Sequence, residues 1–379
     1  MNTNELTINR LPSLTWFRLG VNDAKADISG LSERKAAPEI TAPEGVIIRS
    51  MDAKEAPVCR IPEEAYVAGK SAILTDTDFP SGLGAQFVQY MGGGSIRCVE
   101  IPAGFKSDTP VVITIRHADG SDAKERLLFL VKEGADAKVI LCSRGGAEAG
   151  SAQQEFVMTQ VILEKDAKLD FSRVNLLAED TVLLDDIGVC EAENARFTYR
   201  KADLGASKSY GGLSVWAAGE NAQTEIETAY LKTGCQLLDM NYHIIHSGAK
   251  SVSRIRLKGV LAGEASKTFR GTIDFRKGCT GSDGDEREEV CLLDDAVVNK
   301  TVPVILCEEE DVDGRHGASI GRINEDELFY CESRGIDEAA ARHLLVRGRL
   351  LSVTRKIPDE DLKTEISDRI RDELSGPGR

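Results

Sequence analysis

Three octapeptides decide the fold: EKDAKLDF at 164–171, AENARFTY at 192–199 and GENAQTEI at 219–226. Each has a polar turn, a small residue and then alternating apolar and polar residues, which is the pattern of a strand with one buried face. Two weaker copies flank them, EGADAKVI at 133–140 and HSGAKSVS at 246–253. The aligned alanines, at positions 137, 167, 195, 222 and 249, lie 30, 28, 27 and 27 residues apart.

A repeat of this length that is made of strands predicts a β-solenoid, because a single turn cannot bury its apolar face and must stack on its neighbours. A β-sandwich with evenly spaced turns is the alternative. No long helical pattern interrupts the region. We therefore expect an all-β core, a parallel β-helix, over residues 85–332, with a short mixed region at 1–84 and a helical region at 333–379.

The last segment has the pattern of two amphipathic helices. Asp337 is placed to cap the first helix, and Pro358 opens the second. In the second, Leu362, Ile366 and Ile370 recur every four residues and form one apolar stripe. This stripe either packs on the solenoid or binds a partner, and the sequence leaves both possibilities open.

The net charge of −15 argues against binding to nucleic acid or to an anionic membrane surface. The first residues lack the apolar core of a signal peptide, and no run approaches the ~18 apolar residues of a membrane span. We therefore expect a cytoplasmic protein.

The nine cysteines are odd in number and irregularly spaced, and no CxxC occurs. In a cytoplasmic protein this pattern predicts reduced thiols, and it argues against a closed zinc site or a ferredoxin-type cluster site. Cys279, Cys291 and Cys307 fall near the end of the expected solenoid. Each taken singly is expected to be a small core residue.

His316, one of only five histidines, lies in the stretch GRHG at 314–317. A metal ligand, a catalytic base and a simple turn are all compatible with it. His243 and His246 are three residues apart, so on a strand they point to opposite faces and cannot share a metal ion.

Carboxylates are plentiful in the same region, at positions 274, 283, 285, 294, 295 and 308–311. Paired acids of this kind would suit a carbohydrate-active β-helix enzyme. Such enzymes also need aromatic platforms, and aromatics make up only 5% of this chain.

Residues 243–350 resemble the SufB/SufD family of iron–sulfur cluster assembly proteins. The resemblance lies in TFRGTIDFRKG (268–278), NKTVPVIL (299–306) and HGASIGRINEDELFYCESRGIDEAAARHLLVRG (316–348), and RLPSLTWFRLGVN (10–22) is similar to the N-terminal segment of the family. It implies a right-handed parallel β-helix that pairs with a SufB-like subunit, binds the SufC ATPase through its helical tail and catalyses no reaction itself.

The resemblance also implies a role for His316. Gly317 follows it where SufB-like members have glutamate, and Glu288 stands where they place a key cysteine, with Cys291 offset by three residues. The chain is thus similar to SufD, and a diverged SufB-like homodimer is the alternative. In the SufD pattern the matching histidine faces the paired subunit and helps to hold a nascent, transient iron–sulfur cluster that passes to apoproteins. An inert structural partner of a SufB-like subunit is also possible.

Overall fold

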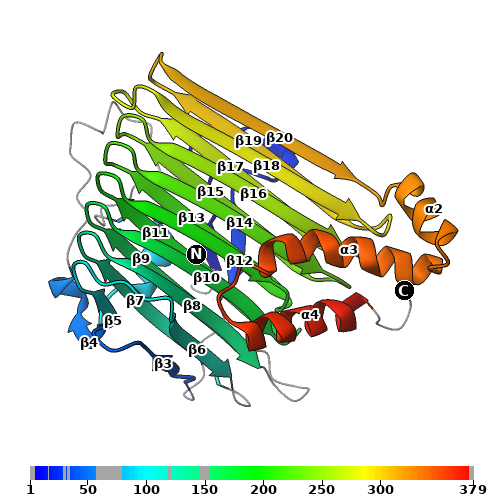
Figure 1. The fold of residues 1–379 in the computed structure, drawn as a ribbon, viewed down its shortest axis with the longest axis horizontal. Coiled ribbons are helices and arrows are strands. Elements are labelled where there is room, and N and C mark those ends of the chain that lie inside the picture. Colours follow the sequence, from blue (N-terminus) through cyan, green and yellow to red (C-terminus); the bar gives the residue numbers. More distant parts are fainter. Residues whose placement is uncertain are drawn as a thin grey trace.

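A computed structural model describes residues 5–15, 17–28, 31, 35–56, 79–117, 121–145 and 153–374. Two long sheets face each other across a common interior, and the chain alternates between them, so that every second strand pairs in parallel (Figure 1). This arrangement confirms the parallel β-helix that the repeat predicts. We call its interior the lumen.

Sheet I and sheet II each hold nine strands. Sheet I consists, in spatial order, of β3 (Pro38–Thr41), β6 (Val111–His117), β8 (Asp136–Gly145), β10 (Lys168–Leu177), β12 (Arg196–Asp203), β14 (Gln223–Lys232), β16 (Val252–Leu261), β18 (Ser282–Leu292) and β20 (Val312–Gly321). Sheet II consists of β4 (Ile47–Asp52), β5 (Ser95–Ile101), β7 (Ala123–Val131), β9 (Gln153–Leu163), β11 (Thr181–Glu191), β13 (Lys208–Ala217), β15 (Leu237–His246), β17 (Ser266–Phe275) and β19 (Val298–Cys307). Only β3 and β4, at the N-terminal end, pair antiparallel with their neighbours in these two sheets.

The remaining elements lie outside the two sheets. They are the strand pair β1 (Glu5–Ile8) and β2 (Ala24–Asp27), the short 3₁₀ turns at Phe17–Leu19 and Ala53–Glu55, and the helices α1 (Ala85–Met91), α2 (Glu325–Ser333), α3 (Glu338–Thr354) and α4 (Glu360–Leu374). No helix in the described ranges is long and apolar enough to cross a membrane.

The strand register corrects the outer copies of the sequence repeat. Ala167, Ala195 and Ala222 stack one above another as aligned, because Lys168 pairs with Arg196 and Arg196 with Gln223. The register places Ala135, not Ala137, below this stack and Ser251, not Ala249, above it. Each correction is a shift of two residues, which keeps every side chain on the same face of the sheet.

Apolar side chains from alternate positions of both sheets fill most of the lumen. Aromatic rings stack from turn to turn, with ring centroids of Phe129 and Phe171 5.4 Å apart and those of Phe171 and Tyr199 6.2 Å apart. Such contacts add to the free energy of burying apolar surface. The stack therefore joins neighbouring turns into one core.

A column of charged side chains also runs inside the lumen, formed by His117, Glu155, Arg173, Asp185, Lys201, Asp203 and Lys232. Arg173 reaches Glu155 and Asp185, each at 3.0 Å. Lys232 lies 2.8 Å and Lys201 3.3 Å from Asp203. Burial alone would raise the pKa of Asp203, but the adjacent Lys232 and Lys201 hold it well below its ordinary value. Each buried charge thus has an opposite charge as its neighbour.

The two sheets are covered on their outer faces by different parts of the chain. Helices α3 and α4 lie across sheet I (Figure 1). On sheet II, the N-terminal segment is fastened by the buried Arg270, whose guanidinium donates to the carbonyl oxygens of Val21 at 2.5 Å and Asp23 at 3.1 Å. Asp239 pairs with the same guanidinium at 2.6 Å.

The helical tail confirms one expected cap and corrects another. The Asp337 carboxylate accepts from the backbone N–H of Ala340, which begins α3 as predicted. The last helix begins at Glu360, not at Pro358, and Asp359 accepts from the N–H of Leu362. The tail also holds a third helix, α2, which begins after Asn324.

Arg173→Met should lower the free energy of unfolding by about 3–5 kcal/mol, because it leaves Glu155 and Asp185 without a buried cation. Urea denaturation followed by circular dichroism measures this change. Lys250→Met is the matched control, since its ion pair with Glu220 is exposed and should contribute little. Equal stability of both variants would show that the charged column contributes nothing to folding.

Candidate functional site

The C-terminal end of the β-helix is open. Among the described strands, β19 pairs only with β17 and β20 only with β18, so one edge of each strand has no strand beside it. The side chains of β20 are almost all exposed, and the exposed apolar residues at this end include Val298, Ile305 and Ile320. An uncapped sheet edge of this kind is a template for pairing with another chain.

His316 lies at the mouth of the lumen. The register pairs Ile255 with Glu286 and Glu286 with His316, so the three residues occupy the same face on successive turns. Ile255 belongs to the luminal core, which places the side chain of His316 on the luminal face of the last turn. It is exposed there because no further turn covers it, as the sequence predicted for a surface position.

Glu288 lies below the mouth and is fully bonded. It pairs with Lys267 and accepts from Thr301 Oγ1 at 2.6 Å and Tyr230 Oη at 3.1 Å. Lys267 and Glu288 are both buried. This small network closes the lumen beneath the last turn.

Glu286 is different, because it is only 3% exposed and no described residue donates a hydrogen bond to it or pairs with its charge. Its carboxylate reaches across the lumen to Gly271, where an added Cβ would lie only 1.9 Å from it. Burial raises the pKa of Glu286 to about 8, and the neighbouring Glu288 carboxylate acts in the same direction. Glu286 is therefore a neutral carboxyl group at pH 7.

The outer face of the same edge is a charged hollow of about 1,080 Å³ between β18, β20 and the helical tail, lined in part by Arg287, Arg322, Arg349, Glu289 and Glu327. Next to it, Arg254 and Arg315 both bond Asp283, and Arg256 and Arg287 both bond Asp285.

These ion pairs bear on the carbohydrate-active alternative. Burial alone would raise the pKa of Asp283 and Asp285, but the hydrogen bonds and charges of the arginines bring it below the ordinary value. Asp274 is buried and bonded to Arg276 at 2.7 Å. A general acid needs a raised pKa and access to substrate, so these acids do not form the pair that such an enzyme requires.

The family comparison agrees with this architecture. The SufBD core domain of SUF system FeS cluster assembly matches residues 114–349, which is more than half of the chain.

The chain belongs to the SufBD family.

Its relatives are distant. A chloroplastic iron–sulfur cluster assembly SufBD family protein of Arabidopsis thaliana is 28% identical over 173 residues, which cover 46% of this chain and 31% of that protein. A SufBD family protein of Staphylococcus saprophyticus is 24% identical over 286 residues, covering 75% and 60%. The iron–sulfur cluster assembly protein SufD of Bacillus subtilis is 24% identical over 211 residues, covering 55% and 48%. The matches thus span about a third to three-fifths of the length of these relatives.

The cysteines of this SufBD protein do not gather at His316. Cys279, Cys291 and Cys331 are buried free thiols, as expected for core residues, and burial raises the pKa of Cys279 to about 11. Cys307 is exposed, contrary to that expectation, because it faces the open last turn. Cys190 is disulfide-bonded, which corrects the prediction that all described cysteines are reduced, and Cys59 lies outside the described residues.

No group of three His, Cys, Asp or Glu side chains in the described part of this SufBD chain is placed to hold a metal ion. His243 and His246 lie on opposite faces, as predicted. His243 Nε2 is 3.3 Å from Asp274, and His246 bonds Ser251 and Ser253 at 2.7 and 2.8 Å. Both are buried structural residues.

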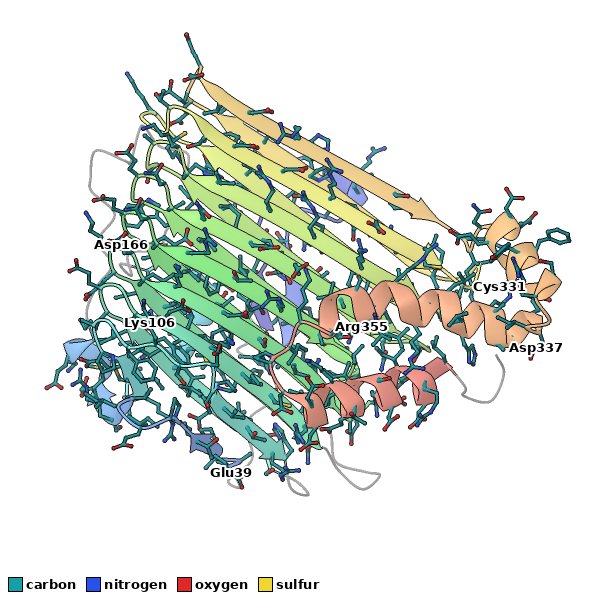
Figure 2. The ribbon with its side chains drawn as sticks, viewed as in Figure 1. Glu39, Lys106, Asp166, Cys331, Asp337 and Arg355 are labelled. Atoms are coloured by element: carbon teal, nitrogen blue, oxygen red, sulfur yellow. The ribbon has the colours of Figure 1, made fainter. Side chains whose placement is uncertain are left out.

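The stripe of Leu362, Ile366 and Ile370 packs on the β-helix. All three side chains are at most 4% exposed and contact a cluster that includes Val174 and Leu204 on the outer face of sheet I. Of the two possibilities that the sequence left open, the structure shows the internal one. The exposed large apolar residues of the tail are instead Phe329, Tyr330 and Leu344, on α2 and α3 (Figure 2 labels Cys331 in α2 and Asp337 at the start of α3).

Sequence reasoning missed Glu286 and the exposed N-terminal residues. The stretch DGDEREEV at 283–290 has the composition of a solvated edge, and only the register with Ile255 shows that Glu286 faces the lumen. A signal was present, since Arg254 and Arg256 recur 29 residues before Asp283 and Asp285, one turn apart. That spacing could have fixed the register and the faces.

Glu286→Gln should change how stability depends on pH. Its pKa in the fold lies above the ordinary value of 4.5, so the folded state binds the extra proton, and stability falls as pH rises from about 5 through 8. The variant lacks this titration. Its free energy of unfolding relative to the parent should therefore increase steadily between pH 5 and 9.

Urea denaturation at several pH values measures this difference. Glu289→Gln is the control, because Glu289 is exposed on the outer face of the same strand. A difference that does not change with pH would show that Glu286 is already ionised in the folded protein.

Proposed function

We propose that this chain is a SufD-like, non-catalytic subunit of a cytoplasmic scaffold that builds iron–sulfur clusters and passes them to apoproteins. It pairs with a SufB-like subunit through its open β-helix end and binds a SufC-like ATPase through its helical tail. The observation that carries the proposal is the uncapped last turn with His316 at its mouth. A site at an open edge can be completed by a partner and opened again.

The chemistry of the mouth suits a transient cargo. Neutral imidazole is a good ligand for iron, and one histidine with no converging cysteines holds a cluster weakly. The described residues offer no set of three ligands, so the rest would come from the paired subunit. A shared, incomplete site favours release, which a scaffold requires.

The N-terminal segment extends the proposed pairing surface. Lys300 of β19 donates to the carbonyl oxygen of Leu19 at 3.3 Å, which fastens this segment beside the open end. Its large apolar side chains point to solvent, with Leu14 60%, Phe17 81% and Leu19 53% exposed. Exposed apolar residues on a fastened segment beside an open edge support contact with another protein.

His316→Ala should leave the three-protein complex intact but deplete its iron and sulfide. Removing an exposed side chain usually changes the free energy of unfolding by about 0.5 kcal/mol or less, whereas losing one of few ligands weakens a labile site strongly. The chain is co-expressed with SufB-like and SufC-like proteins, and iron, sulfide and visible absorbance are measured after anaerobic reconstitution. Ser319→Ala, on the outer face of the same strand, is the control.

Two results would contradict the proposal. Failure of the parent chain to co-purify with either partner would remove the scaffold role. Wild-type loading of iron and sulfide in the His316→Ala complex would place the cluster elsewhere, and Cys307 would be the next ligand to test.

Phe329→Ser should weaken binding of the ATPase at least tenfold without changing thermal stability, because Phe329 is 71% exposed and buried aromatic residues dominate many interfaces. Glu332→Ser on the same helix is the control. Ile366→Asp should instead lower the melting temperature, since it places a charge under α4. If Phe329→Ser binds normally, the ATPase docks on another surface.

A further inference from the structure

Glu286 occupies a luminal position that stability does not explain. One turn earlier the same position holds Ile255, so an apolar side chain fits there. A buried carboxyl group without a donor costs free energy. Glu288, two residues away on the same face, shows what a satisfied acid looks like in this lumen, with three bonding partners.

The opposite sheet leaves room for this carboxylate. Gly271 faces Glu286 across the lumen, and any side chain at this position would overlap the carboxylate oxygens. The next residue along sheet II on this face is Pro303 of β19, which pairs with Gly271 and lies in the last turn. The space above Glu286 therefore belongs to the open mouth.

His316 is the neighbour of Glu286 on that side. Paired residues of adjacent strands lie about 4.8 Å apart, and both side chains stand on the luminal face. A carboxylate and an imidazole at this separation can reach one ion between them. Oxygen and imidazole nitrogen are ligand types that divalent first-row metals accept.

We propose that Glu286 and His316 together bind a divalent iron ion at the mouth of the lumen, as the loading site for the cargo of the scaffold. The inference rests on the proposed function and adds a second ligand to it. Water or the paired subunit would fill the other coordination positions, since the described chain has no third ligand here. Glu286 thus acts from below the site, where no partner residue can reach.

The test is anaerobic titration of the full chain with Fe²⁺, followed by calorimetry, and with Co²⁺, followed by visible absorbance. The parent should bind one ion. Glu286→Gln and His316→Ala should each weaken binding at least tenfold, and the double variant should show no binding at this site. Glu289→Gln, on the outer face of β18, should bind like the parent.

Glu286→Ile guards against a folding defect, because isoleucine already occupies the equivalent position one turn earlier. It should keep the parent melting temperature and lose the ion. If Glu286→Gln and Glu286→Ile bind Fe²⁺ as tightly as the parent, the inference is wrong.

The complex with the two partner proteins separates this inference from the proposed function. Failure of the Glu286→Gln complex to load iron, with normal co-purification, supports the inference. Normal loading in the Glu286→Gln complex together with loss of loading in the His316→Ala complex overturns the inference but leaves the scaffold proposal standing. Normal loading in both complexes overturns both.

Discussion

The in-register parallel stacking of successive turns is the constraint on which the rest of this structure depends. Each residue lies directly beside its counterpart one turn earlier, as Ala167, Ala195 and Ala222 show. A polar or charged residue that faces the lumen must therefore find its partner on a neighbouring turn. Arg173, Lys201 and Lys232 do so by alternating with acids along the lumen, and the same stacking leaves the last turn without a neighbour.

The solenoid could be predicted from the sequence because its repeat is visible in the small residues at the corners. The register of the outer copies could not. Ala137 and Ala249 are each two residues from the true equivalents, and a shift of two preserves the alternation that identifies a strand. The tail shows a different limit. The stripe with Ile366 at its centre was recognisable as one apolar face, but a stripe does not reveal whether its own chain or another protein covers it.

The site was only partly predictable for a related reason. His316 stood out because histidine is rare here and glycine follows it, and its exposed position agrees with the sequence argument. Glu286 lies in a run of charged residues and looks like surface. Its face depends on pairing with Ile255, a contact between residues 31 apart that no local pattern encodes. Charged residues that face a solenoid lumen are thus hard to separate from surface residues in a single sequence.

The same stacking also limits how cargo could reach the proposed site. Below the mouth, Lys267, Glu288 and Thr301 are bonded to one another, and the buried Tyr230, Tyr242 and Phe269 fill the turns beneath them. Breaking the Lys267–Glu288 pair would leave an unpaired buried charge, so this floor stays closed. Under the proposed function, cargo therefore enters and leaves only through the open last turn. The surface that a paired β-helix would cover is then the surface through which the cluster must pass, so pairing itself would control access to His316.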